Sequence, residues 1–225
     1  MGLYVDSAVL AEVASLRACF PLAGVTTNPS IMLAALEAGQ RLDDLAILRE
    51  LVALEFPTVM AQPTGATEED LYAAAMRYVE LAPARMVTKI LLTPEGLRAG
   101  LRLKHQGARV AFTCVSTAEQ AYCASAAGAD WVIPYVGRLR RSGADPCERI
   151  SHMARLIRGT GSGTRILAAS IKHAADMVEA TLAGADDVTA GATVVASLLA
   201  DPITEAAAAQ FGADWQRFQA GSRAE

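Results

Sequence analysis

The sequence predicts a (β/α)8 TIM barrel, formed by a single domain over residues 1–225 with an extra C-terminal helix. Short apolar, β-like runs alternate with helical patterns from one end of the chain to the other, and this alternation predicts a parallel sheet. Eight such runs recur at intervals of about 28 residues, which suits this barrel. A doubly wound open sheet is the alternative, but the chain has no glycine-rich dinucleotide fingerprint.

Each predicted strand is a short apolar run bounded by turn residues. In chain order the strands are residues 3–6, 24–27, 58–62, 86–90, 109–113, 131–135, 165–170 and 187–190. Several of the intervening helices have a capping side chain directly before a proline at the first helical position. These start signals are Asn28-Pro29, Thr93-Pro94 and Asp145-Pro146, and Asp145 with Glu148 has the spacing of a capping box.

Two helices have features of their own. In residues 68–81, the side chains of Leu71, Ala75, Tyr78 and Leu81 form one apolar stripe, so this helix is expected to pack on the outside of the barrel. Residues 202–218 form a helix with no strand to accompany it. We expect that helix either to cap the barrel or to pack on a neighbouring subunit.

Composition and charge exclude several classes of protein. The chain is 52% apolar and 20% charged, as in a folded globular protein, and its net charge of −4 disfavours nucleic-acid binding. The first twenty residues lack the basic and apolar segments of a signal peptide, and no apolar run reaches the roughly 18 residues of a membrane helix. We therefore expect a small-molecule substrate and no nucleic-acid or membrane partner.

The cysteines indicate the compartment. Cys19, Cys114, Cys123 and Cys147 form no Cys-x-x-Cys pair and have no clustered histidines beside them. Neither a disulfide framework nor a metal site is predicted from this spacing. A reducing, cytoplasmic location is expected.

One lysine stands out within a predicted strand. Lys89 interrupts the apolar run of residues 86–92, and lysine is almost never fully buried unless it is paired or functional. Desolvation lowers the pKa of an amine, and a neutral amine attacks a carbonyl to form a Schiff base. The other reading is a structural lysine at a strand end that reaches solvent or a carboxylate.

Polar residues follow the carboxyl ends of the other strands, where this fold builds its active sites. Each of them alone would be read as a cap or turn residue. Seven consecutive strands, however, each deliver a polar side chain to the same rim around one lysine. The residues are Asp6, Thr26, Asn28, Gln62, Lys89, Thr113, Tyr135 and Ser170.

A basic run follows the sixth strand. Residues 138–141 read Arg-Leu-Arg-Arg, which is usually a solvated face. At the top of the barrel, one of these guanidinium groups is instead placed to bind a phosphate, together with Ser170 and the helix start after it. Arg138 is the first candidate.

Residues 24–31, Gly-Val-Thr-Thr-Asn-Pro-Ser-Ile, resemble the signature of the transaldolase family. The resemblance continues through residues 3–6, 61–62, 86–97, 134–138 and 168–172. It is to the short-chain branch, which contains small transaldolases and fructose-6-phosphate aldolases. It implies a cofactor-free (β/α)8 barrel with a Schiff-base lysine, in a ring-like homo-oligomer for which a decamer is one candidate state.

The resemblance also assigns roles. Lys89 would form the Schiff base, Asp6 would contact substrate hydroxyls and the nearby amine, and Thr26 with Asn28 would contact a bound dihydroxyacetone unit. Tyr135 would be the acid/base residue, and Gln62 with Thr113 would hold the water through which it acts. Arg138 and Ser170 would bind the phosphate.

Two positions distinguish the activities within the branch. Transaldolases generally have glutamate at the position of Gln62 and phenylalanine at that of Tyr135, whereas the aldolases have glutamine and tyrosine, as here. Cleavage of a ketose Schiff base leaves an enamine, and a nearby phenol can protonate it, which phenylalanine cannot. We therefore expect reversible cleavage of fructose 6-phosphate to dihydroxyacetone and glyceraldehyde 3-phosphate, with a transaldolase as the alternative.

The chain also departs from the branch. Thr88 and Leu91 stand where an apolar residue and a proline are usual, Ser116 where tyrosine is common, and Gly137 where the aldolases have asparagine. The eighth strand, residues 188–192, lacks the proline-containing sequence of close relatives. Thr88, Leu91 and the altered eighth strand motivate a second hypothesis, a catalytically silent barrel that binds sugar phosphates. A third is that Lys89 is only an ion-pair partner of Asp6.

Overall fold

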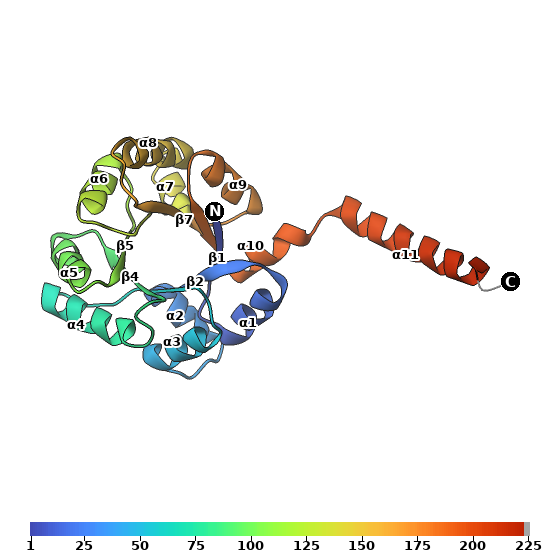
Figure 1. Ribbon diagram of the computed structural model, residues 1–225, viewed down its shortest axis with the longest axis horizontal. Coiled ribbons are helices and arrows are strands. Elements are labelled where there is room, and N and C mark those ends of the chain that lie inside the picture. Colours follow the sequence, from blue (N-terminus) through green and yellow to red (C-terminus); the bar gives the residue numbers. More distant parts are fainter. Residues whose placement is uncertain (223–225) are drawn as a thin grey trace. The chain divides into compact units, whose positions relative to one another are not determined.

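Eight parallel strands close into a barrel in the order of the sequence, as the computed structural model shows (Figure 1). The structure describes residues 1–222. Every predicted strand is present, so the predicted (β/α)8 barrel is confirmed. The strands are β1 (Gly2–Asp6), β2 (Leu22–Thr26), β3 (Thr58–Ala61), β4 (Met86–Leu91), β5 (Arg109–Thr113), β6 (Trp131–Ile133), β7 (Arg165–Ile171) and β8 (Asp187–Ala190).

Helices surround the barrel, and two of them, α2 and α3, lie between β2 and β3. The helices are α1 (Leu10–Cys19), α2 (Pro29–Glu37), α3 (Asp44–Ala53), α4 (Glu68–Val79), α5 (Pro94–His105), α6 (Ala118–Ala126), α7 (Val136–Arg141), α8 (Pro146–Gly159), α9 (Ala174–Leu182), α10 (Ala192–Ala196), the 3-10 turn η1 (Ser197–Leu199) and α11 (Pro202–Ser222). The chain divides into two compact units, Met1–Val195 and a second that begins at Ala196.

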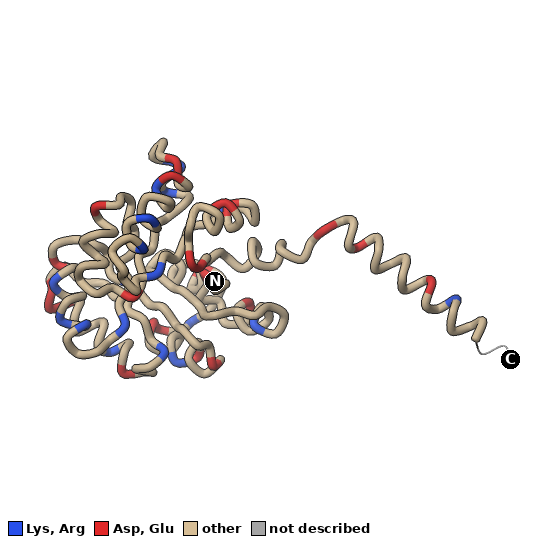
Figure 2. The backbone as a smooth tube through the Cα atoms, turned by 45° about the horizontal axis from the view of Figure 1, so that its top comes forward, with Lys and Arg blue, Asp and Glu red and all other residues tan. Residues whose placement is uncertain are grey.

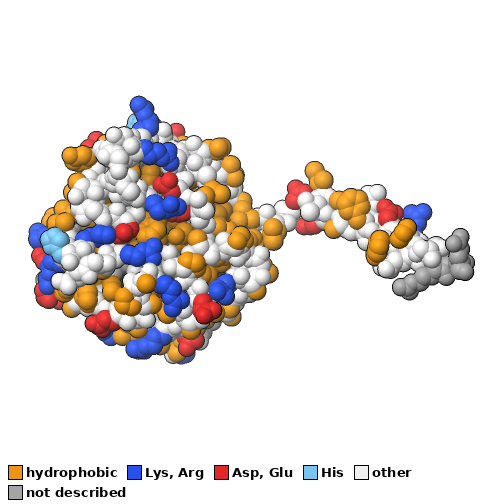
Figure 3. Space-filling view, in the orientation of Figure 1, with side chains coloured by type: hydrophobic (Ala, Val, Ile, Leu, Met, Phe, Trp, Pro, Cys, Tyr) orange, Lys and Arg blue, Asp and Glu red, His pale blue; other side chains and the backbone are white. Residues whose placement is uncertain are grey.

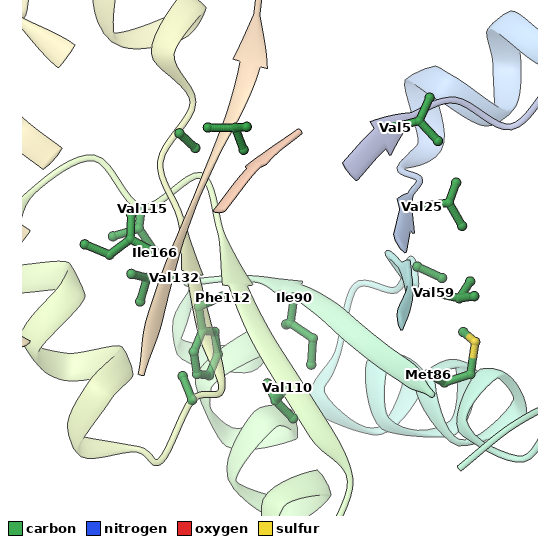
Figure 4. Packing of buried hydrophobic residues seen from close by; sticks show 14 of the residues in the cluster. Val5, Val25, Val59, Met86, Ile90, Val110, Phe112, Val115, Val132 and Ile166 are labelled. Carbon is green, nitrogen blue, oxygen red and sulfur yellow. The ribbon is translucent and has the colours of Figure 1, made fainter. Parts of the chain in front are cut away.

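Alternate strand residues face the helices and form the main core. Figure 4 shows such side chains from successive strands, among them Val59, Ile90 and Phe112. The predicted apolar stripe of α4 joins this core through buried Ala75 and Tyr78. Because successive side chains of a strand point to opposite faces, the residues between these positions point into the barrel.

The barrel interior is filled below the site. A second cluster contains Tyr4, Met60, Val87, Trp131 and Leu167, so the interior is packed rather than open. At the base of the barrel, buried Asp187 accepts hydrogen bonds from Trp131 Nε1 at 3.0 Å and from Arg165 Nε and Nη2 at 2.8 and 2.7 Å. This packed floor holds the next layer of side chains in place.

The predicted helix starts are confirmed by their capping bonds. Asn28 Oδ1 accepts from the Ile31 amide at 3.1 Å, and Thr93 and Asp145 cap α5 and α8 in the same way. The capping box predicted for Asp145 and Glu148 is half formed: Asp145 accepts from the Glu148 amide at 3.4 Å, but within residues 1–222 the carboxylate of Glu148 does not return a bond.

Thr88 faces the helix layer and lowers the stability of the barrel. It shares its face of β4 with Met86 and Ile90, it is 1% exposed, and within residues 1–222 its Oγ1 has no hydrogen-bond partner. Burying an unpaired hydroxyl costs about 1–3 kcal/mol. We expect Thr88→Val, which replaces the hydroxyl with a methyl group, to raise the free energy of unfolding by about 1 kcal/mol in urea denaturation. A loss of stability would contradict this burial argument.

The C-terminal helix α11 contains the predicted residues 202–218 and continues to Ser222. None of its side chains is buried, and Ile203, Phe211, Trp215 and Phe218 are exposed along it, as the orange side chains of this helix show in Figure 3. Within residues 1–222, no single helix is long and apolar enough to cross a membrane. Residues 192–199 and α11, as a bent pair, reach that length and composition only together.

Candidate active site

A cavity of about 620 Å³ opens at the carboxyl ends of the strands. It lies within the first unit, and six of the nine predicted site residues line it: Asp6, Asn28, Gln62, Tyr135, Arg138 and Ser170. The other three, Thr26, Lys89 and Thr113, are fully buried and lie behind its surface. The predicted polar rim is therefore two layers deep, with an exposed layer above a buried one.

Lys89 occupies the buried layer of β4. The inward-facing residues of this strand are Val87 in the packed interior, then Lys89, then Leu91 on the cavity wall. Lys89 is 1% exposed, and its Nζ donates a hydrogen bond to the backbone oxygen of Thr27 at 3.0 Å. Burial lowers the pKa of this amine, although the charges of Asp6 and Cys114 act in the opposite direction. A carbonyl acceptor holds one N–H group of the neutral amine and leaves its lone pair free.

Asp6 is tied to a buried pair of threonines. Its Oδ1 accepts from Thr26 Oγ1 at 2.5 Å, and Thr26 Oγ1 lies 2.9 Å from Thr189 Oγ1. Within the described residues, Asp6 and Lys89 form no ion pair within 4.0 Å, so the carboxylate is positioned by the hydroxyl of Thr26 rather than by Lys89. This arrangement leaves the second oxygen of Asp6 for the cavity.

Tyr135 places a phenol at the cavity wall. It follows β6 as the residue before α7, and its hydroxyl accepts from Thr113 Oγ1 at 3.1 Å. Burial raises its pKa to about 12, with smaller contributions of the same sign from Cys114 and Asp6. The phenol is therefore protonated at neutral pH and can donate a proton. The guanidinium of Arg138 lies 5.4 Å from the centre of its ring.

Gln62 and Asn28 supply neutral amides to the same cavity. Gln62 directly follows β3, and its side chain has no hydrogen-bond partner within residues 1–222, so both of its polar atoms are available. Asn28 uses Oδ1 to cap α2 and keeps its amide nitrogen for the cavity. It therefore combines the structural role of a cap with a position on the cavity wall.

The arginines of the basic run in α7 have different surroundings. Arg138 and Arg141 are three residues apart, so they share one face of the helix, and both line the cavity with Lys172. Arg140 points elsewhere and pairs with Asp176 at 2.6 Å and with Glu179 at 3.3 Å. The solvated-face reading thus fits Arg140, whereas two guanidinium groups remain for an anion.

Backbone strain directs two further side chains. Ser170 lies in the part of β7 where the register with β8 shifts, and its φ is +58°. This left-handed conformation turns it from the helix side towards the cavity. Cys114, with φ of +59°, also lines the cavity after β5. Such conformations cost about 1–3 kcal/mol in residues other than glycine and concentrate at functional sites.

Sequence reasoning missed two residues that contribute here, Thr189 and Cys114, and did not distinguish Arg141 within the basic run. Thr189 was detectable, since it is the inward-facing polar residue of β8. Ser116, in contrast, does not line this cavity, and its amide and hydroxyl donate hydrogen bonds to Gln120 Oε1 at 2.8 and 3.0 Å. The altered residue at this position therefore supports the start of α6 rather than the cavity.

Comparison with solved structures supports the architecture. A mutant of mandelate oxidase with a monooxide FMN adduct superposes with a TM-score of 0.58 at 16% identity. The match covers 87% of this chain and 66% of the other. At this identity the likeness concerns the fold alone, and it agrees with the closed eight-stranded barrel.

Comparison of sequences identifies the family. Residues 3–223 match the family model described as Transaldolase/Fructose-6-phosphate aldolase. A probable transaldolase of Roseiflexus castenholzii is 35% identical, over 98% of this chain and all of the relative. Probable transaldolases of Thermus thermophilus and Bacillus cereus are 34% and 33% identical over 96% and 97% of this chain and 99% of each relative. The chain is a member of the transaldolase/fructose-6-phosphate aldolase family.

Proposed function

We propose that the protein is a Schiff-base aldolase that reversibly cleaves fructose 6-phosphate to dihydroxyacetone and glyceraldehyde 3-phosphate. The observation that carries the proposal is Lys89, which is fully buried and has a lowered pKa in the layer directly beneath a polar cavity. A lysine in such surroundings supplies the neutral amine that attacks a ketone. No other lysine of the described chain is buried.

The first half of the reaction uses the buried layer. Nζ of Lys89 adds to C2 of the ketose, and loss of water gives the iminium ion. Tyr135 gives its proton to the hydroxyl that leaves as water, so its oxygen can then accept the proton of the C4 hydroxyl, through a water held by Gln62 and Thr113, as the C3–C4 bond breaks. Glyceraldehyde 3-phosphate leaves, and the electron pair of the broken bond remains in an enamine on Lys89. Asp6, Thr26 and Asn28 bind the dihydroxyacetone unit.

The second half decides the class of reaction. Protonation of the enamine carbon, followed by hydrolysis of the imine, releases dihydroxyacetone, whereas attack of the enamine on a second aldose transfers the unit. The phenol of Tyr135, which carries the proton taken from the C4 hydroxyl, is available to protonate the enamine carbon. The neutral amide of Gln62 beside the cavity supports the same outcome.

A transaldolase is the second candidate, and it is equally supported by the relatives, which are named probable transaldolases. Dihydroxyacetone release from fructose 6-phosphate, measured with and without erythrose 4-phosphate, separates the two. The proposal predicts release without an acceptor at a rate comparable to that of transfer. Formation of sedoheptulose 7-phosphate much faster than release would establish the transaldolase instead.

Gln62→Glu tests what decides between transfer and release. It replaces the amide NH2 group with a carboxylate oxygen and keeps the size of the side chain. A carboxylate at this position accepts hydrogen bonds and no longer donates one, so the water beside Tyr135 is held differently. We expect the ratio of transfer to release to rise about tenfold. An unchanged ratio would show that Gln62 does not decide between transfer and release.

The same proposal includes a phosphate site, a location and an assembly. Arg138 and Ser170 line one part of the cavity, where an Arg guanidinium forms paired bonds to phosphate oxygens. The unpaired thiols of the four cysteines support a cytoplasmic location. The exposed aromatic residues of α11 support a homo-oligomer.

A further inference from the structure

We infer that Arg141 is a second guanidinium for the phosphate of the substrate, and that it sets the preference for phosphorylated over unphosphorylated aldehydes. The inference rests on the proposed function, which provides the phosphate ester. It adds a residue to the Arg138 and Ser170 pair and gives Gly137 a role. Its chemistry is the recognition of a phosphate monoester by two guanidinium groups.

The charges around the cavity support an anion at this place. Arg138, Arg141 and Lys172 line it, and Asp6 is its one acidic lining residue within the described part of the chain, so three cations face a single carboxylate. The carboxylate is engaged with Thr26. Elsewhere on the barrel the two signs are interspersed, as Figure 2 shows, so this local excess of positive charge is a property of the cavity.

Arg141 also has no competing partner. Within residues 1–222 its side chain forms no hydrogen bond or ion pair, whereas Arg140 is held by Asp176 and Glu179. An arginine without an internal partner at a cavity wall retains all five of its donors for a ligand. Arg140 therefore stabilises the contact of α7 with α9, whereas Arg141 is available to a ligand.

Gly137 provides the room for this arrangement. A Cβ atom on Gly137 would lie 2.8 Å from the backbone oxygen of Ser170, 2.9 Å from its hydroxyl and 3.6 Å from Arg141 Nη1. A Cβ here would push α7, and Arg141 with it, away from Ser170, whereas the 3.6 Å distance to Arg141 Nη1 is an ordinary contact. Glycine therefore allows α7 to pack against Ser170 and brings Arg141 to the same part of the cavity as Ser170.

The test measures phosphate binding and aldehyde selectivity on the full-length protein. Arg141→Gln is compared with Arg155→Gln, which removes the same charge from an exposed position on α8. Calorimetric titration with inorganic phosphate is expected to show about tenfold weaker binding in Arg141→Gln. In aldol addition of dihydroxyacetone, its kcat/KM ratio for glyceraldehyde 3-phosphate over glyceraldehyde is expected to fall by about the same factor.

The control and a second variant complete the design. Arg155→Gln should bind phosphate as the wild type does, and Gly137→Ala should weaken phosphate binding, with little further loss when Arg141→Gln is added. Equal phosphate affinity in Arg141→Gln and Arg155→Gln would overturn the inference, as would a wild type that binds no phosphate. The titration requires no turnover, so its result is independent of whether Lys89 forms a Schiff base.

Discussion

Lys89→Met is expected to lower the rate of fructose 6-phosphate cleavage by at least about ten-thousand-fold, because it removes the only atom that forms the covalent intermediate. The same change should not destabilise the fold. Methionine fills a similar volume, and the cost of desolvating an amine is removed. We expect the free energy of unfolding at pH 7 to stay equal or to rise by up to about 2 kcal/mol, measured by urea denaturation.

The difference in stability between Lys89→Met and the wild type should depend on pH. Because the pKa of Lys89 is lowered in the folded protein, the unfolded chain binds more protons between that value and the ordinary value of 10.5. The stability of the wild type therefore gains with rising pH in this window, and the advantage of Lys89→Met should shrink between pH 7 and pH 10. A structural ion pair with Asp6 predicts instead that Lys89→Met loses about 3–5 kcal/mol.

Tyr135→Phe is expected to have the second largest effect. It keeps the aromatic ring and hence the contact with Arg138, and it removes only the hydroxyl that Thr113 holds. Release of dihydroxyacetone should fall by about 10²–10³-fold, because loss of a positioned proton donor has effects of this order. The enamine then persists longer, so transfer to erythrose 4-phosphate should fall less than release does.

The control for this variant is the covalent intermediate itself. If Tyr135→Phe still forms a dihydroxyacetone adduct on Lys89, the loss concerns proton transfer and not formation of the imine. Equal losses of release and transfer would contradict the role of Tyr135 in the fate of the enamine. A catalytically silent barrel predicts no turnover in the wild type and phosphate binding that Lys89→Met leaves unchanged.

The sequence was sufficient to predict the barrel because its strands are short apolar runs with turn residues at both ends. Strand ends were less predictable. Residues 131–135 were expected as one strand, but β6 ends at Ile133, since Pro134 has no amide to continue the ladder. Tyr135 then forms only an isolated bridge to Ala169. The position of a side chain at such an end depends on this local geometry.

The parts of the site that could not be predicted depend on backbone conformation and on helix registration. Ser170 was identified by resemblance, but its direction depends on a positive φ, which no local pattern indicates for serine. Arg141 became distinguishable from Arg140 only when the basic run proved to be the six-residue helix α7. Likewise, the close contact of Gly137 with Ser170 joins two segments that are distant in the sequence.

Borohydride reduction in the presence of dihydroxyacetone tests the central claim most directly. The chain has three lysines, Lys89, Lys104 and Lys172, and they differ in environment: Lys104 pairs with Asp130 at 2.7 Å, and Lys172 is exposed at the cavity. Peptide mass mapping is expected to find the reduced adduct on Lys89 alone, and none in Lys89→Met. Absence of an adduct in the wild type, or an adduct on Lys172 in place of Lys89, would contradict the proposed mechanism.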